Sequence, residues 1–160
     1  MRANLLSKQT LLQFLPFVFV MVASVAPAAA QGLGVRAGVS IDPDQVYIGG
    51  HYETDALVDR LHFRPNFEAG IGDDLTLLSL NFEFAYKFPS RHGWRLYAGG
   101  GPAVNFYSRD NGRDNGRDSS SEAGLNILLG VERSSGLFFE FKIGALDSPN
   151  LKFGVGWTFQ

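Results

Sequence analysis

Two groups of residues in this sequence have types and spacings that could bind a metal ion. The first is a pair of histidines, His51 and His62, on either side of a segment centred on residues 56–57. If the flanking segments pair symmetrically about that centre, the two imidazoles face each other. Catalytic zinc usually takes three protein ligands, and no third ligand has a useful spacing. A two-histidine metal site and polar filling of an interior are the alternatives; we favour polar filling and predict no metal.

The second group is the tandem repeat DNGRDNGRD at residues 110–118. Its acids, Asp110, Asp114 and Asp118, recur every four residues, whereas the acidic ligands of an EF-hand loop recur every two. The repeat is therefore a poor calcium loop. Asn-Gly is a strong turn former, and alternating Asp and Arg keep a segment hydrated and locally neutral. We predict an expanded, mobile surface loop of the kind that tolerates insertion.

The N-terminus has the features of a secretory signal peptide. A positively charged start, with Arg2 and Lys8, precedes a mostly apolar stretch over residues 11–25, and small residues follow in an A-x-A pattern. About 15 apolar residues fall short of the roughly 20 that a membrane-spanning helix needs. We predict a cleaved signal peptide over residues 1–30 and a single exported domain over residues 31–160.

The composition of the exported part excludes several kinds of chemistry. The chain has 14 Lys and Arg, of which two precede the predicted cleavage point, so 12 basic residues stand against 16 acidic ones, a net charge of −4. Nothing in that balance suggests binding to nucleic acid. Cysteine is absent, so neither a disulfide framework nor a thiol nucleophile is available.

Eight segments of the exported part alternate between apolar residues and polar or small ones. A period of two is typical of strands whose two faces have different surroundings. The segments span residues 33–41, 45–53, 61–71, 78–88, 94–106, 123–132, 137–145 and 151–159. Strands of about nine or more residues, in this number, are typical of a small membrane barrel. We therefore predict an all-β fold, an eight-stranded antiparallel up-and-down transmembrane β-barrel.

Turn residues separate the segments and predict one register in detail. Asp73-Asp74 is placed to close a two-residue hairpin, which sets Arg64 directly opposite Glu83. Pro65 and Pro102 interrupt two of the strands. Because proline removes a donor from the ladder, we interpret them as bulges or sites of weak pairing.

The polar face of the predicted strands suits the inside of a barrel. It is rich in glycine, and the interior of an eight-stranded barrel has little room. Its charges nearly cancel, as enclosed charges must. We predict that the following residues form a polar network in the interior: Arg36, Glu53, Arg64, Glu68, Glu83, Lys87, Arg95, Glu132, Glu140, Lys142 and Lys152.

Aromatic residues gather near one end of the predicted strands. If the N-terminus is periplasmic, even-numbered strands end, and odd-numbered strands begin, at the periplasmic side. Membrane barrels carry aromatic girdles where the apolar band meets water. We predict a periplasmic girdle that consists of Tyr52, Phe63, Tyr86, Phe88, Trp94, Phe139, Trp157 and Phe159.

The signal peptide, the eight alternating strands and the ending Phe153-Gly-Val-Gly-Trp157-Thr-Phe159 resemble the small outer-membrane β-barrel proteins of Gram-negative bacteria, of the OmpA-transmembrane and OmpX kind. The resemblance covers roughly residues 32–160. It implies an outer-membrane location, contact with outer-membrane lipid and lipopolysaccharide, and recognition of the C-terminal strand by the barrel-assembly machinery. In that family the recognised aromatic is usually the last residue, whereas Phe159 is penultimate here. We expect no counterpart of the OmpA peptidoglycan-binding domain.

Some outer-membrane barrels of this size are enzymes. Lipid A deacylases use a histidine two residues before a serine, and none of the three histidines here has a serine at that position. No His/Ser pair that would suit lipid A palmitoyl transfer stands out on the apolar face either. We therefore predict that the protein is not an enzyme and needs no cofactor.

The remaining prediction is a structural or cell-surface role, in envelope integrity or surface interaction. Under the predicted topology the outer loops carry the acids Asp42, Asp44, Asp73, Asp74, Asp110, Asp114, Asp118, Glu122 and Asp147, against Arg109, Arg113 and Arg117. This rim could bind divalent cations that bridge lipopolysaccharide phosphates, or an external partner; a solvated rim without a ligand is the alternative. A narrow diffusion channel and a soluble periplasmic, lipocalin-like binder of an apolar ligand are the alternative functions.

Overall fold

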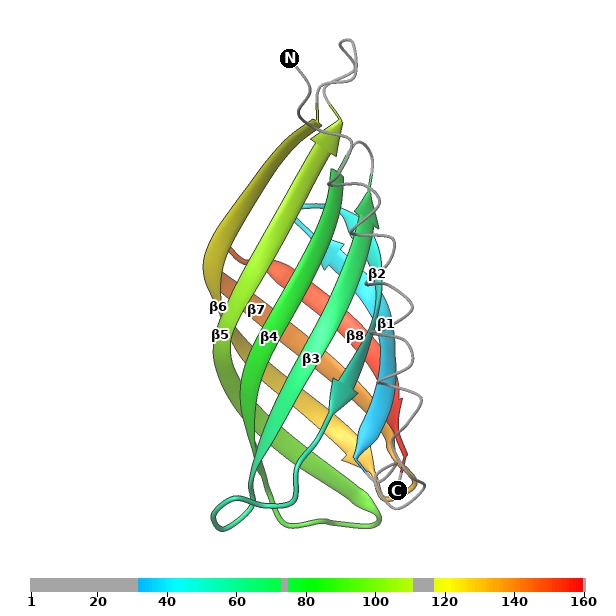
Figure 1. Ribbon diagram of the computed structural model, residues 1–160. Helices are drawn as coiled ribbons and strands as arrows, with labels where there is room; N and C mark the ends of the chain where they lie inside the picture. The colour runs from blue at the N-terminus through cyan, green and yellow to red at the C-terminus, as the bar shows by residue number, and fades with distance from the viewer. Residues whose placement is uncertain (1–31, 73–74, 111–116, 160) are drawn as a thin grey trace, which may run out of the picture. The chain divides into compact units, whose positions relative to one another are not determined.

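The eight predicted strands close into a single antiparallel barrel (Figure 1). The structure is a computed structural model that describes residues 32–72, 75–110 and 117–159. The predicted signal peptide and the middle of the DNGR repeat lie outside the described residues. Each strand pairs with the next along the chain, and β8 pairs with β1, so the fold is the all-β up-and-down barrel that the alternation predicts.

The strand boundaries agree with the predicted ranges except at one end of the barrel. The strands are β1 (Leu33–Ile41), β2 (Gln45–Tyr52), β3 (Leu61–Gly72), β4 (Leu75–Lys87), β5 (Trp94–Asp110), β6 (Arg117–Arg133), β7 (Leu137–Leu146) and β8 (Leu151–Thr158). We call the end with the connections 53–60, 88–93 and 134–136 the lower end, and the end with the connections 42–44 and 147–150 the upper end, as they lie in Figure 1.

We predicted a loop for the whole repeat at residues 110–118, but part of it belongs to strands. Its first residue ends β5 and its last two begin β6, and Asp110 pairs with Arg117. The period-two pattern becomes polar on both faces beyond Phe106. Beyond Phe106 the strands therefore cannot be recognised from alternating hydropathy, although the cross-strand pairing of β5 and β6 continues.

The two faces of the wall have opposite surroundings, and the charged face is inside. Arg64 is 1 % exposed and Glu83 is 0 % exposed, whereas Ile48 is 65 % exposed and Phe67 is 46 % exposed. A soluble barrel that binds an apolar ligand has the reverse arrangement, with its apolar face inward. The lipocalin-like alternative is therefore wrong for this fold.

Inward-facing glycines make room for three large aromatic rings. A Cβ atom on Gly130 would lie 2.2 Å from the ring of Tyr97, and one on Gly156 would lie 2.3 Å from Phe138. Tyr47 occupies the corresponding space beside two further glycines of β1 and β8. The interior of an eight-stranded barrel is only wide enough for side chains, so each large ring needs a neighbour without a side chain.

The two prolines inside strands do not produce bulges. The register between β3 and β4 is constant through Pro65, and the register between β5 and β6 is constant through Pro102. The β4–β5 ladder, however, has no pairing between Asn81↔Ala103 and Phe84↔Gly100, which brackets Pro102. Weak pairing is the correct interpretation there, since proline has no N–H to give to the ladder. The described residues contain no helix long and apolar enough to cross a membrane.

Candidate functional site in the barrel interior

A cluster of charged side chains fills the middle of the barrel, and Glu140 on β7 lies at its centre. Glu140 Oε1 accepts a hydrogen bond from Arg36 at 3.1 Å, and Oε2 accepts one from Arg64 at 3.2 Å and one from the Tyr97 hydroxyl at 2.9 Å. All four side chains are buried. Donors from β1, β3 and β5 thus meet on one carboxylate, which ties opposite sides of the wall together.

Lys142, two residues further along β7, joins a second group of carboxylates. Its ammonium lies 2.9 Å from Glu68 Oε1 and 2.7 Å from Glu83 Oε1. Glu68 also accepts hydrogen bonds from Arg36 at 3.2 Å and from Lys152 at 2.8 Å. Buried charges are costly unless they are paired and hydrogen-bonded, and each of these ions has at least one partner of opposite sign.

A third group of ions lies at the lower end, where water has more access. Lys87 bonds to Glu53 and to Glu132, and Arg95 bonds to Glu132 at 3.2 Å. The Arg95 side chain is 43 % exposed, so it belongs to the lower mouth and not to the closed interior. Arg64 Nε lies 3.4 Å from Glu53 Oε2, which connects this group to the central cluster.

A chain of uncharged amides continues the network toward the upper end of the interior. Asn126 donates to Asn81 at 2.7 Å, Asn81 donates to Asn66 at 2.8 Å, and Asn66 donates to Glu83 at 2.7 Å. Above this chain of amides, Asn105 donates to the carbonyl oxygen of Asp147 at 2.7 Å. We did not predict these amides as part of the network because we considered only charges, although all four lie on the polar face of their strands.

The guanidinium groups of Arg36 and Arg64 also pack against the faces of aromatic rings. The Arg64 guanidinium lies 4.9 Å from the ring centre of Tyr97 and 5.1 Å from that of Phe138, and Arg36 lies 5.5 Å from Phe138. A cation over a ring face is attracted by the quadrupole of the ring. Tyr97 and Phe138 thus contribute both volume and electrostatic stabilisation to the interior.

A few buried nitrogens in this region have no hydrogen-bond partner among the described residues. They are Nε and Nη2 of Arg36, Nε of Arg64 and Nδ1 of His51. His51 Nε2 lies 3.0 Å from the Thr158 hydroxyl, so the other ring nitrogen is the unpartnered one. Buried polar groups of this kind are commonly satisfied by internal water.

Nine of the eleven predicted network residues lie on the inner face of the strands, whereas Glu53 directly follows β2 and Arg95 lies at the lower mouth. Not every predicted pairing occurs. Arg64 is opposite Glu83 in the β3–β4 ladder, so the predicted register is confirmed. The two side chains bond to other partners: Arg64 to Glu140 and Glu83 to Lys142 and Asn66. In a narrow barrel the strand register alone does not determine which side chains form ion pairs. A long side chain can reach across the interior as easily as it can reach the residue opposite it on the next strand.

The predicted pairing of the two histidines is wrong. His51 pairs with Asn66, four residues beyond His62, and His62 pairs with Ala85. The connection 53–60 is not a symmetric loop, because it contains a tight turn that is closed by a hydrogen bond from the N–H of Leu61 to the carbonyl of Val58. No group of three potential metal ligands occurs among the described residues.

The aromatic residues of the predicted girdle all lie toward the lower end, on or beside the outer face. Phe63 is half-buried; the others are exposed: Tyr52, Tyr86, Phe88, Trp94, Phe139, Trp157 and Phe159. Arg133 lies with its guanidinium 6.0 Å from the ring centre of Trp94. An aromatic ring beside a basic side chain is the arrangement expected where an apolar surface meets water.

The predicted acidic rim is divided between turns and strands. Asp42, Asp44 and Asp147 lie in exposed turns, and Asp42 accepts a hydrogen bond from Asn150 at 2.6 Å. Asp118 and Glu122 lie on β6 instead of in a loop. Asp73, Asp74, Asp114 and Arg113 lie outside the described residues.

Comparison with solved structures identifies the fold. The N-terminal β-barrel domain of Pseudomonas aeruginosa OprF is 18 % identical, with a TM-score of 0.54, over 79 % of this chain and 95 % of that domain. Neisserial surface protein A is 17 % identical, with a TM-score of 0.57, over 79 % of this chain and 94 % of its own. The chain has the fold of a small outer-membrane β-barrel.

The outer-membrane barrel fold accounts for the inverted burial of the wall. In that fold the outer face meets lipid and the inner face is polar. No family model matches the sequence, and comparison with curated proteins finds no match. At this level of identity the two solved structures establish the architecture, and the interior residues must be interpreted from their own contacts.

Proposed function

We propose that the protein is an integral outer-membrane barrel with a structural or cell-surface role and an interior closed by side chains. The observation that carries the proposal is the inverted burial: Arg64 and Glu83 are inside, whereas Ile48 and Phe67 are outside. An exposed belt of large apolar side chains around the whole wall would be severely unfavourable in water and is favourable in lipid.

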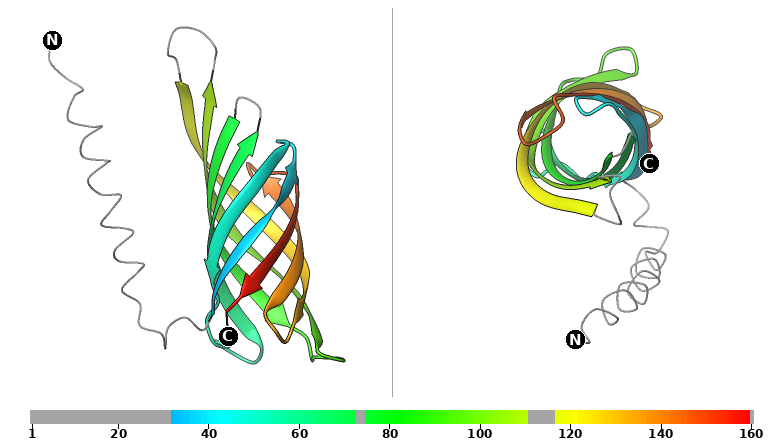
Figure 2. Two further views of the ribbon diagram at one scale, coloured as in Figure 1. Left: turned by 90° about the vertical axis from the view of Figure 1, so that its right-hand side faces the viewer. Right: turned by 90° about the horizontal axis from the view of Figure 1, so that it is seen from above.

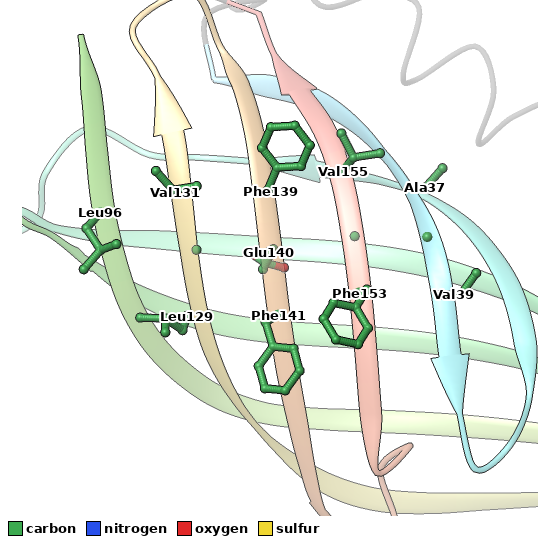
Figure 3. Close-up of a pocket in the computed structure, with 13 residues that line it drawn as sticks. Ala37, Val39, Leu96, Leu129, Val131, Phe139, Glu140, Phe141, Phe153 and Val155 are labelled. Atoms are coloured by element: carbon green, nitrogen blue, oxygen red, sulfur yellow. The ribbon is translucent and has the colours of Figure 1, made fainter. Parts of the chain in front are cut away.

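The outer face also has the shape that acyl chains fit. A hollow of about 510 Å³ lies on the outer face over the neighbouring strands β5–β8 and β1. Figure 3 shows the side chains that line it. Phe139, Phe141 and Phe153 line this hollow together with aliphatic side chains. The rings of Phe141 and Phe153 pack edge to face, with their centres 4.8 Å apart. The surface of the hollow is almost entirely apolar, which suits lipid tails and no polar solute.

A closed interior favours a structural role over transport. The ions around Glu140 and Lys142 span the interior from β1 to β7, and the amide chain lies above them. A narrow diffusion channel is the second candidate. The unpartnered nitrogens of Arg36 and His51 favour it, because they leave places for internal water.

The proposal includes the partners that the family resemblance implies and no catalytic step. Lipid and lipopolysaccharide contact the outer face. The barrel-assembly machinery recognises the C-terminal strand β8, which contains Trp157 and is followed directly by Phe159. The exposed turns and strand tips of the upper end face the cell exterior, where a surface role is carried out.

Cell fractionation combined with gel mobility tests the proposal. The protein is expected in the outer-membrane fraction and should migrate differently in unboiled and boiled samples, because a closed barrel resists unfolding by detergent at room temperature. Recovery in the soluble periplasmic fraction would overturn the membrane location. A membrane-bound protein that gives steady current in planar bilayers would support the channel over the closed barrel.

A further inference from the structure

One arginine interrupts the uncharged outer face of the wall near its lower end. Below the tips of β5 and β6, the outward-facing positions of the described strands carry a single charged side chain, that of Arg133 at the end of β6. Arg133 lies on the same face as Leu129 and Val131, because successive residues of a strand alternate between the two faces. It pairs directly with Trp94, and its guanidinium lies 6.0 Å from the centre of the indole ring. A basic side chain on the lipid-facing wall of a barrel costs little only near the interface.

A second arginine flanks Trp94 on its other side. Residues 91–94 form a two-residue turn, in which Arg91 and Trp94 exchange backbone hydrogen bonds at 2.8 and 3.0 Å. His92 and Gly93 both have positive φ, 52° and 78°, as a type I′ turn requires. Residues that pair directly project to the same face of a ladder, so Arg91, Trp94 and Arg133 form one outward-facing row. We call these three residues the arginine–tryptophan row.

Neither arginine of the row forms an ion pair with a described carboxylate. The segments 88–96 and 133–139 contain no aspartate or glutamate. The acid next to Arg133 in sequence is Glu132, which faces the barrel interior and bonds to Lys87 and Arg95 instead. A guanidinium is always charged and has five N–H donors, and contact of its face with an indole ring leaves those donors free. The row therefore offers positive charge and unused donors on the outer face.

Two further acids of the lower end lie on another side of the barrel. Asp55 and Asp59 belong to the connection 53–60, between β2 and β3. Arg91 belongs to the connection 88–93, between β4 and β5. The left view of Figure 2 shows these two connections, teal and green, apart from each other at the lower end. The positive charge of the row is therefore not cancelled by these acids.

The apolar hollow on the outer wall begins directly above the row. Leu96 lies two residues above Trp94 on β5, and Val131 lies two residues above Arg133 on β6. Both side chains line the hollow of about 510 Å³, and Figure 3 shows them at its β5–β6 side. An acyl chain that fills the hollow can therefore place its headgroup at the row, at the height of the aromatic girdle.

We propose that the arginine–tryptophan row binds the phosphate of an anionic phospholipid in the periplasmic leaflet, with one acyl chain of that lipid in the hollow above. Arginine binds phosphate through two parallel N–H···O bonds. The α-carbons of Arg91 and Arg133 lie about 10 Å apart across Trp94, a span that two arginine side chains can close on one phosphate. The inference rests on the proposed function, because it requires the wall to be embedded in a bilayer with its lower end in the periplasm.

The charge of the row selects the headgroup. Two guanidinium groups without a carboxylate repel the ammonium or choline group of a zwitterionic headgroup. They attract a phosphodiester whose alcohol has no amine, and phosphatidylglycerol has that chemistry. Free phosphate would contact the arginines only and would leave the hollow unused, so a lipid is the occupant that satisfies both parts of the site.

Quenching of tryptophan fluorescence by brominated lipids measures which lipid lies beside the row. The chain has two tryptophans, so Trp157→Phe leaves Trp94 as the sole indole fluorophore. The barrel is refolded into vesicles of equal parts phosphatidylglycerol and phosphatidylcholine, with the acyl chains of one of the two lipids brominated. We expect the association constant at Trp94 to be at least about threefold higher for phosphatidylglycerol than for phosphatidylcholine.

Two variants assign this preference to the row. Arg91→Gln combined with Arg133→Gln removes two exposed charges and no backbone bond, so the barrel should fold and the ratio of association constants should fall to about one. Arg60→Gln is the matched control, because Arg60 is an exposed arginine of the lower end that lies beside Asp59 in the sequence. It should keep the wild-type ratio. A preference that persists in the double variant, or that Arg60→Gln lowers equally, would overturn the inference.

Inorganic phosphate distinguishes a lipid site from a simple phosphate site. Added at millimolar concentration to the same vesicles, it should leave the preference for phosphatidylglycerol unchanged, because it cannot fill the apolar hollow. Loss of the preference would mean that the arginines hold free phosphate, and the proposed lipid site would be wrong.

The same preparations keep this inference apart from the proposed function. If neither brominated lipid quenches Trp94 and gel mobility does not change on heating, the wall is not in the bilayer and the membrane location is refuted. If both lipids quench Trp94 equally in a heat-modifiable barrel, the membrane location stands and only the phosphate site is refuted.

Discussion

Tyr97 on β5 donates its hydroxyl hydrogen to Glu140 on β7 at 2.9 Å, across the interior and past the intervening strand β6. The tyrosine ring fits there because Gly130 on β6 leaves the space beneath it empty. The hydrogen bond between β5 and β7 thus depends on the absence of a side chain at Gly130, on the strand β6 that lies between them. The predictions below test this coupling of charge and volume.

Glu140→Gln should destabilise the barrel by about 3–5 kcal/mol, because Arg36 and Arg64 lose the carboxylate that pairs them in a dry interior. Tyr97→Phe should cost only about 1 kcal/mol, since it removes one hydrogen bond and leaves the ions paired. Urea unfolding in lipid vesicles measures both. Asp59→Asn, in an exposed turn of the lower end, is the control and should change nothing.

Gly130→Ala should destabilise the protein by about 1–3 kcal/mol, because the new methyl group lies 2.2 Å from the Tyr97 ring and forces it to move. If the ring is the obstacle, Tyr97→Leu in the same chain should recover part of the loss. A Gly130→Ala variant as stable as the wild type would mean that the ring has room to shift.

Ile48→Arg should destabilise the barrel in a bilayer by about 2–4 kcal/mol, the cost of a basic side chain near the bilayer midplane of a membrane barrel. Ile48 is 65 % exposed on β2, several residues above the girdle residue Tyr52. Leu57→Arg, at an exposed position in the lower connection, is the matched control and should be nearly neutral. In a water-soluble barrel the two substitutions would behave alike.

The wild-type barrel should give no steady conductance in planar bilayers, because the ion-paired side chains around Glu140 and Lys142 fill the cross-section of the barrel interior. The double variant Arg64→Ala with Glu140→Ala removes a cation and an anion from one layer without changing the net charge. We expect it to conduct small ions. A wild type that conducts, with current unchanged in the double variant, would show that the water path runs elsewhere.

The strands, their faces and one hairpin register could be predicted from the sequence, because period-two alternation reports which side of a strand meets which environment. The pairing Arg64↔Glu83 follows from a two-residue turn, where geometry leaves one choice. The pairing of His51 could not be predicted, since the connection 53–60 contains its own tight turn and shifts the register.

Side-chain partners in the interior were even less predictable. The sequence identifies Arg64 and Glu140 as inward-facing, but their contact joins β3 to β7 across the interior, and nothing in the local pattern selects it. The extension of β5 and β6 past Phe106 was missed for a different reason. Both faces of those tips are polar, so the alternation disappears although the ladder continues.

The bond between Arg36 and Glu140 joins residues 104 positions apart, from the first strand to the seventh. It cannot form until the two ends of the chain meet and β1 pairs with β8. Before that moment the interior charges face an open, hydrated sheet, and afterwards they are enclosed together. We therefore expect closure of the β1–β8 seam to be the step of assembly at which the ion pairs that cross the interior form and water leaves it.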